Sequence, residues 1–191
     1  MKVIQLYKKE SELIKRAVKN NREAQHVLFE MHAPKMLSVC RCYIKDLYQA
    51  EEAMLNGFFK VFTQLKTFKN EGSFEGWIRR IMVRESISYL RSQRSLEQFE
   101  EDVNEFVETE NLETNLAETE LNVADIQQLI DQLPEGYRVV FVMYAIEGYK
   151  HNEIAKLLNI SEGTSKSQLF KARKLLQQQI VKLKSMENGT R

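Results

Sequence analysis

Apolar residues recur every three or four positions from about residue 10 to about residue 90. Leu13 and Ala17 belong to this series, and such spacing places apolar side chains on one face of an α-helix. Another helix is expected from about Leu47 to Leu65. Ser73 follows a break at Gly72 and is a plausible cap for a helix over about residues 74–92. The first part of the chain is therefore predicted to be helical throughout.

The helical pattern stops near residue 95 and returns at Asn122. The intervening stretch is acidic and poor in large apolar residues, so we expect a flexible linker there. Four further helices follow, at about 122–133 (ended by Pro134), 137–146, 151–158 and from Ser161 to about residue 183. The predicted fold is all-α, with two small helical domains joined by a flexible acidic linker. The expected division is a first domain over 1–94, the linker over 95–121, a second domain over 122–186 and a disordered tail over 187–191.

The formal net charge of +1 conceals a strong asymmetry along the chain. Residues 1–94 have a charge balance of +8, residues 95–137 one of −13, and residues 138–191 one of +6. Basic blocks on both sides of an acidic connector indicate two separate contacts with a polyanion. Two solvated basic surfaces are the simpler alternative, and charge alone leaves it open.

Composition excludes several classes of protein. Only 7 Gly and 2 Pro argue against a fold built from strands and tight turns. No run approaches the ~18 apolar residues that span a bilayer, and no signal peptide is evident, so a cytoplasmic protein without direct membrane insertion is expected. Cys40 and Cys42 form no disulfide framework, and the three histidines are widely spaced. We expect no catalytic residues, no metal site and no cofactor, and hence no enzyme.

The segment from His151 to Ser161 has the pattern of a helix-turn-helix. Ala155 is small where two helices cross closely, and Asn159 tolerates the left-handed conformation of a tight turn. The following helix has one apolar face, opposite Thr164, Ser167, Lys171 and Lys174, with Lys166 and Phe170 on the flank. Such a polar face suits the major groove of DNA. The alternative is an ordinary amphipathic helix with a solvated basic face.

A second candidate site combines the only tryptophan with basic residues. On the helix that begins near residue 74, Trp77, Arg80 and Arg84 fall along one stripe that starts at Ser73, and Phe68-Lys69 precedes it. Aromatic faces can stack on bases while guanidinium groups hold phosphates, a combination typical of single-stranded nucleic-acid binding. Trp77 is equally compatible with a place in the core.

Together, these motifs resemble a known family. The stretch from Phe68 to Ile81 looks like region 2 of a sigma-70-family factor of the extracytoplasmic-function class, and the stretch from Leu133 to Arg173 looks like region 4. The resemblance implies an RNA polymerase sigma factor that reads the minus-35 element as duplex and melts the minus-10 element. Its implied partners are promoter DNA, the clamp coiled coil and flap of core RNA polymerase, and an anti-sigma factor that could hold it at the inner membrane.

The resemblance also assigns residues. The minus-10 strand would be surrounded by Phe68, Lys69, Ser73, Trp77, Arg80 and Arg84. The minus-35 bases would face Lys166, Ser167, Phe170 and Lys171, with phosphates near Thr164, Arg173 and Lys174. The clamp would dock on a helix that carries Asp46, Glu51, Glu52, Asn56 and Phe59, a set that could otherwise be a solvated acidic face.

Three residues depart from the family pattern. Ser165 replaces a β-branched apolar residue, Asn56 is followed by Gly57 inside a helix, and Arg84 stands where a small polar residue is common. A free-standing helix-turn-helix regulator with a helical sensor or dimerisation domain is the main alternative, because such a protein would bind its duplex without polymerase.

Overall fold

The computed structural model describes residues 2–93 and 122–189, and every regular element in these two ranges is a helix. The chain forms two compact units, Met1–Gln93 and Arg94–Arg191, which we call the amino-terminal unit and the carboxy-terminal unit. The all-α, two-domain prediction is thus confirmed. The expected flexible acidic linker lies outside the described residues.

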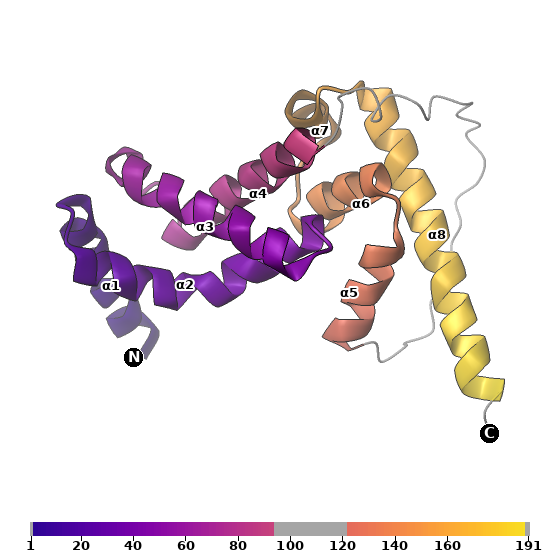
Figure 1. The fold of residues 1–191 in the computed structure, drawn as a ribbon, viewed down its shortest axis with the longest axis horizontal. Helices are drawn as coiled ribbons and strands as arrows, with labels where there is room; N and C mark the ends of the chain where they lie inside the picture. Colours follow the sequence, from indigo (N-terminus) through magenta and orange to yellow (C-terminus); the bar gives the residue numbers. More distant parts are fainter. Residues whose placement is uncertain (1, 94–121, 190–191) are drawn as a thin grey trace. The chain divides into compact units, whose positions relative to one another are not determined.

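The amino-terminal unit contains four α-helices and one short 3₁₀ helix among its described residues (Figure 1). They are α1 (Lys2–Val18), α2 (Arg22–Tyr43), α3 (Leu47–Gln64), the 3₁₀ helix η1 (Leu65–Thr67) and α4 (Phe74–Gln93).

The apolar periodicity did not reveal the break between α1 and α2. Asn20 adopts the left-handed conformation with φ 60°, and the side chain of Asn21 caps α2 by accepting a hydrogen bond from the Ala24 amide at 2.8 Å. Asparagine suits both positions because it tolerates positive φ and offers a side-chain acceptor. The two asparagines therefore end one helix and start the next.

The core of the amino-terminal unit lies among α2, α3 and α4. Met36, Val61, Ile78 and Met82 are fully buried there. Gly57 is the close-approach point between α3 and α4, because a Cβ at this position would collide with the thioether sulfur of Met82. Glycine inside a helix costs up to about 1 kcal/mol relative to alanine, and here it lets the two helices pack closely.

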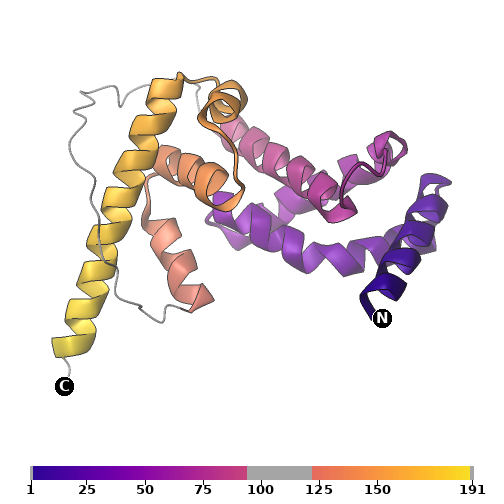
Figure 2. The same ribbon diagram turned by 180° about the vertical axis from the view of Figure 1, so that it is seen from behind.

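The carboxy-terminal unit contains four α-helices and one π-helical turn among its described residues (Figure 2). They are α5 (Val123–Gln132), α6 (Glu135–Phe141), the π-helical turn η3 (Val142–Ile146), α7 (His151–Leu158) and α8 (Glu162–Gly189). The sequence pattern placed the start of α6 at residue 137 and gave no sign of the π-helical turn. Helix α8 continues past residue 183, where its apolar pattern was expected to end, and it reaches Gly189, inside the range 187–191 that was expected to be a disordered tail.

Helices α7 and α8 form the predicted helix-turn-helix. Asn159 ends α7 with φ 57° and ψ 47°, and the Ser161 hydroxyl accepts a hydrogen bond from the Thr164 amide at 2.9 Å at the start of α8. Helix α6 packs along the same side of α8, and Leu169 and Ala172 are buried there. The core therefore covers one face of α8 and leaves its other face to solvent.

Candidate nucleic-acid interface

Three aromatic rings cluster at the start of α4. The ring centroids of Phe68 and Trp77 lie 5.4 Å apart, those of Phe74 and Trp77 lie 5.8 Å apart with planes tilted by 24°, and those of Phe68 and Phe74 lie 5.2 Å apart. Phe74 is buried, whereas Phe68 and Trp77 are half-buried. Trp77 thus packs against a core ring and still presents part of its surface to solvent.

The loop before α4 sets the position of this cluster. Asn70 and Gly72 have positive φ, 58° and 95°, and together they reverse the chain between Phe68 and α4. The Ser73 hydroxyl then caps the helix by accepting a hydrogen bond from the Gly76 amide at 3.0 Å, as the sequence predicted. Ser73 therefore has a structural task whether or not it also contacts a ligand.

Cations and a polar side chain lie around the aromatic rings. Lys69, Ser73, Arg80 and Arg84 are all exposed. The amino-terminal unit therefore offers half-buried rings for stacking, with exposed positive charge on the same helix and the loop before it. Rings and cations in this combination suit unpaired nucleotides, because every base has a face that can stack.

The polar pair of His32 and Glu10 lies next to Phe74 in this cluster, and the sequence pattern did not predict it. His32 Nε2 lies 2.9 Å from Glu10 Oε1, and the His32 ring meets Phe74 edge-on at 5.5 Å. His32 is 7% exposed. The pair connects α1 and α2 directly behind the ring on which Trp77 stacks.

Helix α3 presents an acidic and apolar face. Asp46 caps the helix by accepting a hydrogen bond from the Gln49 amide at 2.9 Å. The exposed side chains that the sequence singled out on this helix are Glu51, Glu52, Asn56 and Phe59. Phe59 is 72% exposed, which is unusual for a phenylalanine in a folded domain.

The sequence missed two further members of this face. Tyr48 is 81% exposed and Leu55 is 50% exposed, and with Glu52 and Phe59 they follow the spacing i, i+4, i+7 and i+11 of a single helical stripe. The sequence did contain a pattern that indicates this second face. Apolar residues occur on two sides of α3, whereas packing against a single core requires an apolar face on one side only.

A groove runs beside this stripe, between α3 and α4. It is lined by Glu52, Ala53, Asn56, Glu85, Ser88, Tyr89, Ser92 and Gln93. Partial burial, followed by the nearby carboxylates of Glu52 and Asp46, raises the pKa of Tyr89. The groove thus continues the negative potential of the α3 face.

Helix α8 presents the candidate duplex-reading face in the carboxy-terminal unit. Lys166, Phe170, Arg173 and Lys174 are exposed, whereas Thr164, Ser167 and Lys171 are half-buried. Lys166, Phe170 and Lys174 are spaced four positions apart and share one stripe, with Arg173 beside it. The most exposed side of α8 is therefore turned toward the predicted flank, because three of the four residues expected on the outward face are half-buried. All seven residues remain at the surface, and the face combines positive charge with one apolar side chain.

Two cation–aromatic contacts support this face. Lys171 Nζ lies 5.7 Å from the centre of the Tyr137 ring, and Arg173 Cζ lies 5.7 Å from the centre of the Tyr144 ring. Such contacts hold long basic side chains over the neighbouring helices. Tyr137 and Tyr144 therefore belong to the site as supporting residues, which the sequence did not indicate.

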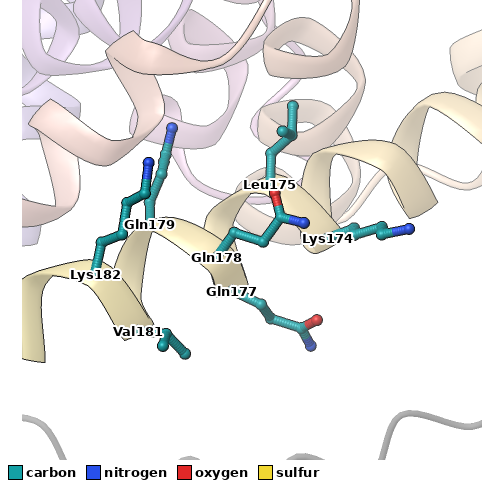
Figure 3. Close-up of a pocket in the computed structure, with 7 residues that line it drawn as sticks. All are labelled: Lys174, Leu175, Gln177, Gln178, Gln179, Val181 and Lys182. Atoms are coloured by element: carbon teal, nitrogen blue, oxygen red, sulfur yellow. The ribbon is translucent and has the colours of Figure 1, made fainter. Parts of the chain in front are cut away.

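A hollow lies beside the second half of α8. Its lining residues all come from this one helix, and Figure 3 shows Leu175 directed toward the neighbouring helices while Gln177 and Val181 point into the open.

No cluster of metal-ligating side chains occurs in the described ranges. Burial raises the pKa of the Cys40 thiol to about 11, which keeps it protonated at neutral pH.

Within the described residues, no helix has the length and apolar character needed to cross a membrane.

The two units match two regions of one protein family. Residues 28–96 match the model of sigma-70 region 2, and residues 124–176 match the model of sigma-70 region 4. The first match contains the aromatic cluster and helix α3, and the second contains the helix-turn-helix.

Complete relatives agree with these matches. The RNA polymerase sigma factor SigV of Bacillus subtilis is 26% identical over 140 residues, 73% of this chain and 81% of that protein. The ECF RNA polymerase sigma-E factor of Haemophilus influenzae is 23% identical over 180 residues, 90% of this chain and 95% of that protein. In fold, the chain is similar to the sigma factor RpoE of Bartonella quintana, solved with the anti-sigma factor NepR, with a TM-score of 0.50 and 17% identity over 80% of this chain and 94% of the other.

Proposed function

The chain belongs to the sigma-70 family of RNA polymerase sigma factors, in its extracytoplasmic-function class, and we propose that its two units divide promoter recognition between them. In this proposal residues 1–94 open the minus-10 element and residues 122–186 read the minus-35 duplex, with 95–121 as a connector and 187–191 as a tail. The observation that carries the proposal is the chemical difference between the two faces: stacked rings with cations in one unit, a basic helix face in the other.

The minus-10 strand would enter at the aromatic cluster. Trp77 and Phe68 offer half-buried rings on which an unpaired base can stack, and the ring of Phe74 supports Trp77 from the core. Lys69, Ser73, Arg80 and Arg84 are exposed on the adjoining loop and helix, where they can hold the backbone of the strand. Because stacking needs an unpaired base, binding here favours the melted state over the duplex.

The minus-35 duplex would receive α8 in its major groove. Lys166, Ser167, Phe170 and Lys171 would face bases, and Thr164, Arg173 and Lys174 would contact phosphates. The support lies in the helix-turn-helix geometry and in the exposure of Lys166, Phe170, Arg173 and Lys174.

Core RNA polymerase would bind the α3 face, through its clamp coiled coil, and its flap would contact the carboxy-terminal unit. Phe59 and Leu55 supply exposed apolar area, and Glu51, Glu52 and Asn56 supply a polar rim. An apolar centre with charged edges is the usual composition of a protein–protein interface.

The proposal extends to the setting in which the protein works. We infer a non-catalytic initiation factor of the cytoplasm, held in check by an anti-sigma factor that could keep it at the inner membrane. A free-standing helix-turn-helix regulator is not favoured, since a match to region 2 occupies most of the amino-terminal unit.

Run-off transcription tests the proposal. Core polymerase with the protein should initiate at a promoter that carries both elements, whereas core polymerase alone should not. Equal product from both reactions would refute the proposal.

A charge-reversal variant tests the α3 face in the same assay. Glu51→Lys with Glu52→Lys should weaken binding to core polymerase and leave helical content unchanged, because both side chains are exposed. The matched control is Glu12→Lys, another exposed glutamate within a helix, on α1. Unaltered affinity in the double variant would return Glu51 and Glu52 to the role of solvated surface charges.

A further inference from the structure

A polar contact joins the two helices of the helix-turn-helix behind its exposed face. His151 Nδ1, in the first turn of α7, lies 2.9 Å from the hydroxyl of Ser165 on α8. Ser165 is fully buried, so this contact lies within the packed interface between the two helices. It gives a physical role to the serine that stands where an apolar residue was expected.

A stacking contact also fixes the imidazole ring of His151. It stacks on the ring of Tyr144, with centroids 4.6 Å apart and planes 24° apart, and Arg173 lies over the same tyrosine ring. The ring of His151 is therefore fixed between the π-helical turn η3 and α8, and an arginine of the proposed DNA face belongs to the same cluster.

Charged groups around His151 come mainly from α8. Burial lowers the pKa of His151; the cations Lys166 and Arg173 lower it further, and Glu162 acts against them. On its own helix, Lys150 precedes His151 and Glu153 follows it in the first turn. Tyr144 is the titratable group that η3 adds on the stacked side.

We propose that His151, held in place by its contact with Ser165 and by its stack on Tyr144, couples minus-35 binding to proton uptake. Since the coupling requires DNA on α8, it rests on the proposed minus-35 role of that helix. The cations that disfavour a protonated imidazole, Lys166 and Arg173, belong to the surface that meets DNA. When Lys166 meets the acceptor edges of bases and Arg173 meets phosphates, their positive charges are offset, and the repulsion that opposes the protonated imidazole weakens.

The sign of the effect follows from linkage. The pKa of His151 is lowered in the free protein and rises when bound DNA offsets the charges of Lys166 and Arg173, so the complex binds a proton more readily than the free protein. Affinity for the minus-35 duplex should therefore increase as the pH falls through the region where histidine titrates. At pH values well above that region, His151 is neutral in both the free protein and the complex, so affinity no longer depends on pH through this residue.

Ser165 makes both proton states possible without moving the ring. A hydroxyl donates to the bare Nδ1 of a neutral imidazole and accepts from the Nδ1–H of a protonated one. An apolar residue at this position would leave the buried nitrogen without a partner in either state, and the protonated form would suffer more.

Holoenzyme binding measurements test the coupling. The measured quantity is the ratio of affinities for a promoter duplex with its own minus-35 element and for one with a scrambled element, at about pH 8 and about pH 6. We expect this ratio to rise about three- to fivefold toward the lower pH with the unaltered protein. His151→Asn should abolish the rise and keep binding at the higher pH, because the asparagine amide can replace Nδ1 but does not titrate.

Two further variants complete the design. His26→Asn, at an exposed histidine of the amino-terminal unit, should retain the full pH response. Ser165→Ala should reduce the response while the fold is kept, since it removes only the hydroxyl and adds no volume to a fully buried position. Equal slopes for the unaltered protein and His151→Asn would overturn the coupling. A ratio of one at every pH would instead refute the minus-35 role itself, so the two failures are distinguishable.

A direct titration follows the protonation of the histidines themselves. The chain has three histidines, so the imidazole C–H resonances of the full-length protein can be followed against pH by NMR, with and without the minus-35 duplex. One histidine should shift its midpoint upward when the duplex is added, and His151→Asn identifies its signal. Three unchanged midpoints under conditions of full duplex binding would overturn the proposal.

Discussion

The aromatic cluster of the amino-terminal unit and the α8 face of the carboxy-terminal unit are built in opposite ways. In the cluster, the ring of Trp77 packs directly on Phe74, which belongs to the core. On α8, Leu169 and Ala172 face the core while Lys166 and Lys174 face solvent. One site is continuous with the core, and the other is separated from it by the width of a helix.

The difference matches the proposed tasks. A strand that has left the duplex needs a shaped stacking surface, and a ring fixed by core packing loses little freedom when a base arrives. A duplex already has a regular groove, so it needs a helix that presents polar side chains at fixed spacing. Substitutions should therefore affect stability and function together in the amino-terminal unit, and separately in the carboxy-terminal unit.

The largest effect is expected from the core member of the cluster. Phe74→Ala should lower the free energy of unfolding by about 3–5 kcal/mol, because it removes a buried ring that Phe68, Trp77 and His32 all contact. Thermal or denaturant unfolding measures this loss. A promoter with a pre-melted minus-10 bubble should not rescue initiation, since the defect is in the fold. Near-normal stability would show that the cluster is independent of the core.

Trp77→Ala should have a smaller effect on stability and a specific effect on strand opening. The loss of a stacking ring costs about 1–3 kcal/mol per base, so opening should slow while closed-complex binding stays nearly intact. Permanganate footprinting reports the opening, and the pre-melted bubble should partly restore initiation. A large fall in melting temperature without rescue by the bubble would show that Trp77 serves mainly as a core residue.

The sequence could predict features that are encoded by neighbouring residues, but not contacts between segments that are distant in the chain. The cap at Ser73, the left-handed turn at Asn159 and the polar side of α8 are encoded within a few neighbouring residues, and each was predictable. The pair of His32 with Glu10 and the close contact of Gly57 with Met82 join distant segments. Local periodicity contains no information about such pairs, because it reports only which face of a helix is apolar.

The same limit applies to the proposed site on α8. Its residues follow from helical spacing, but the half-burial of Lys171 results from Tyr137, far back in the chain on α6. Likewise, Ser165 appears from the sequence as a departure from a pattern, and only the fold shows that His151 accounts for it. The sequence could therefore predict which residues of α8 form the proposed site. It could not predict which side chains of the neighbouring helices contact them.

On α8, a base contact and a phosphate contact should give different results. Lys171→Ala should weaken closed-complex binding by about 1–3 kcal/mol and relax the preference at one minus-35 position. Lys174→Ala should weaken binding to all sequences alike and lower the salt slope by about 1. Neither variant should change strand opening or melting temperature appreciably, because both side chains lie outside the core. A loss of stability comparable to that of Phe74→Ala would contradict the conclusion that the α8 site is separate from the core.

The smallest effect concerns Ser73, where capping and DNA contact coincide in one side chain. Ser73→Ala removes the acceptor for the Gly76 amide and should cost about 0.5–2 kcal/mol of stability. Asparagine and aspartate also cap helices, so Ser73→Asn and Ser73→Asp should both restore the melting temperature. The two replacements should differ in function, because a carboxylate beside Lys69 and Arg80 would repel the phosphates of the incoming strand, whereas an amide would not. We therefore expect normal opening with Ser73→Asn and slower opening with Ser73→Asp, measured on the same promoter at equal protein stability. If the aspartate variant opens the promoter as fast as the asparagine variant, Ser73 only caps α4, and the strand passes beside the aromatic rings without approaching the start of the helix.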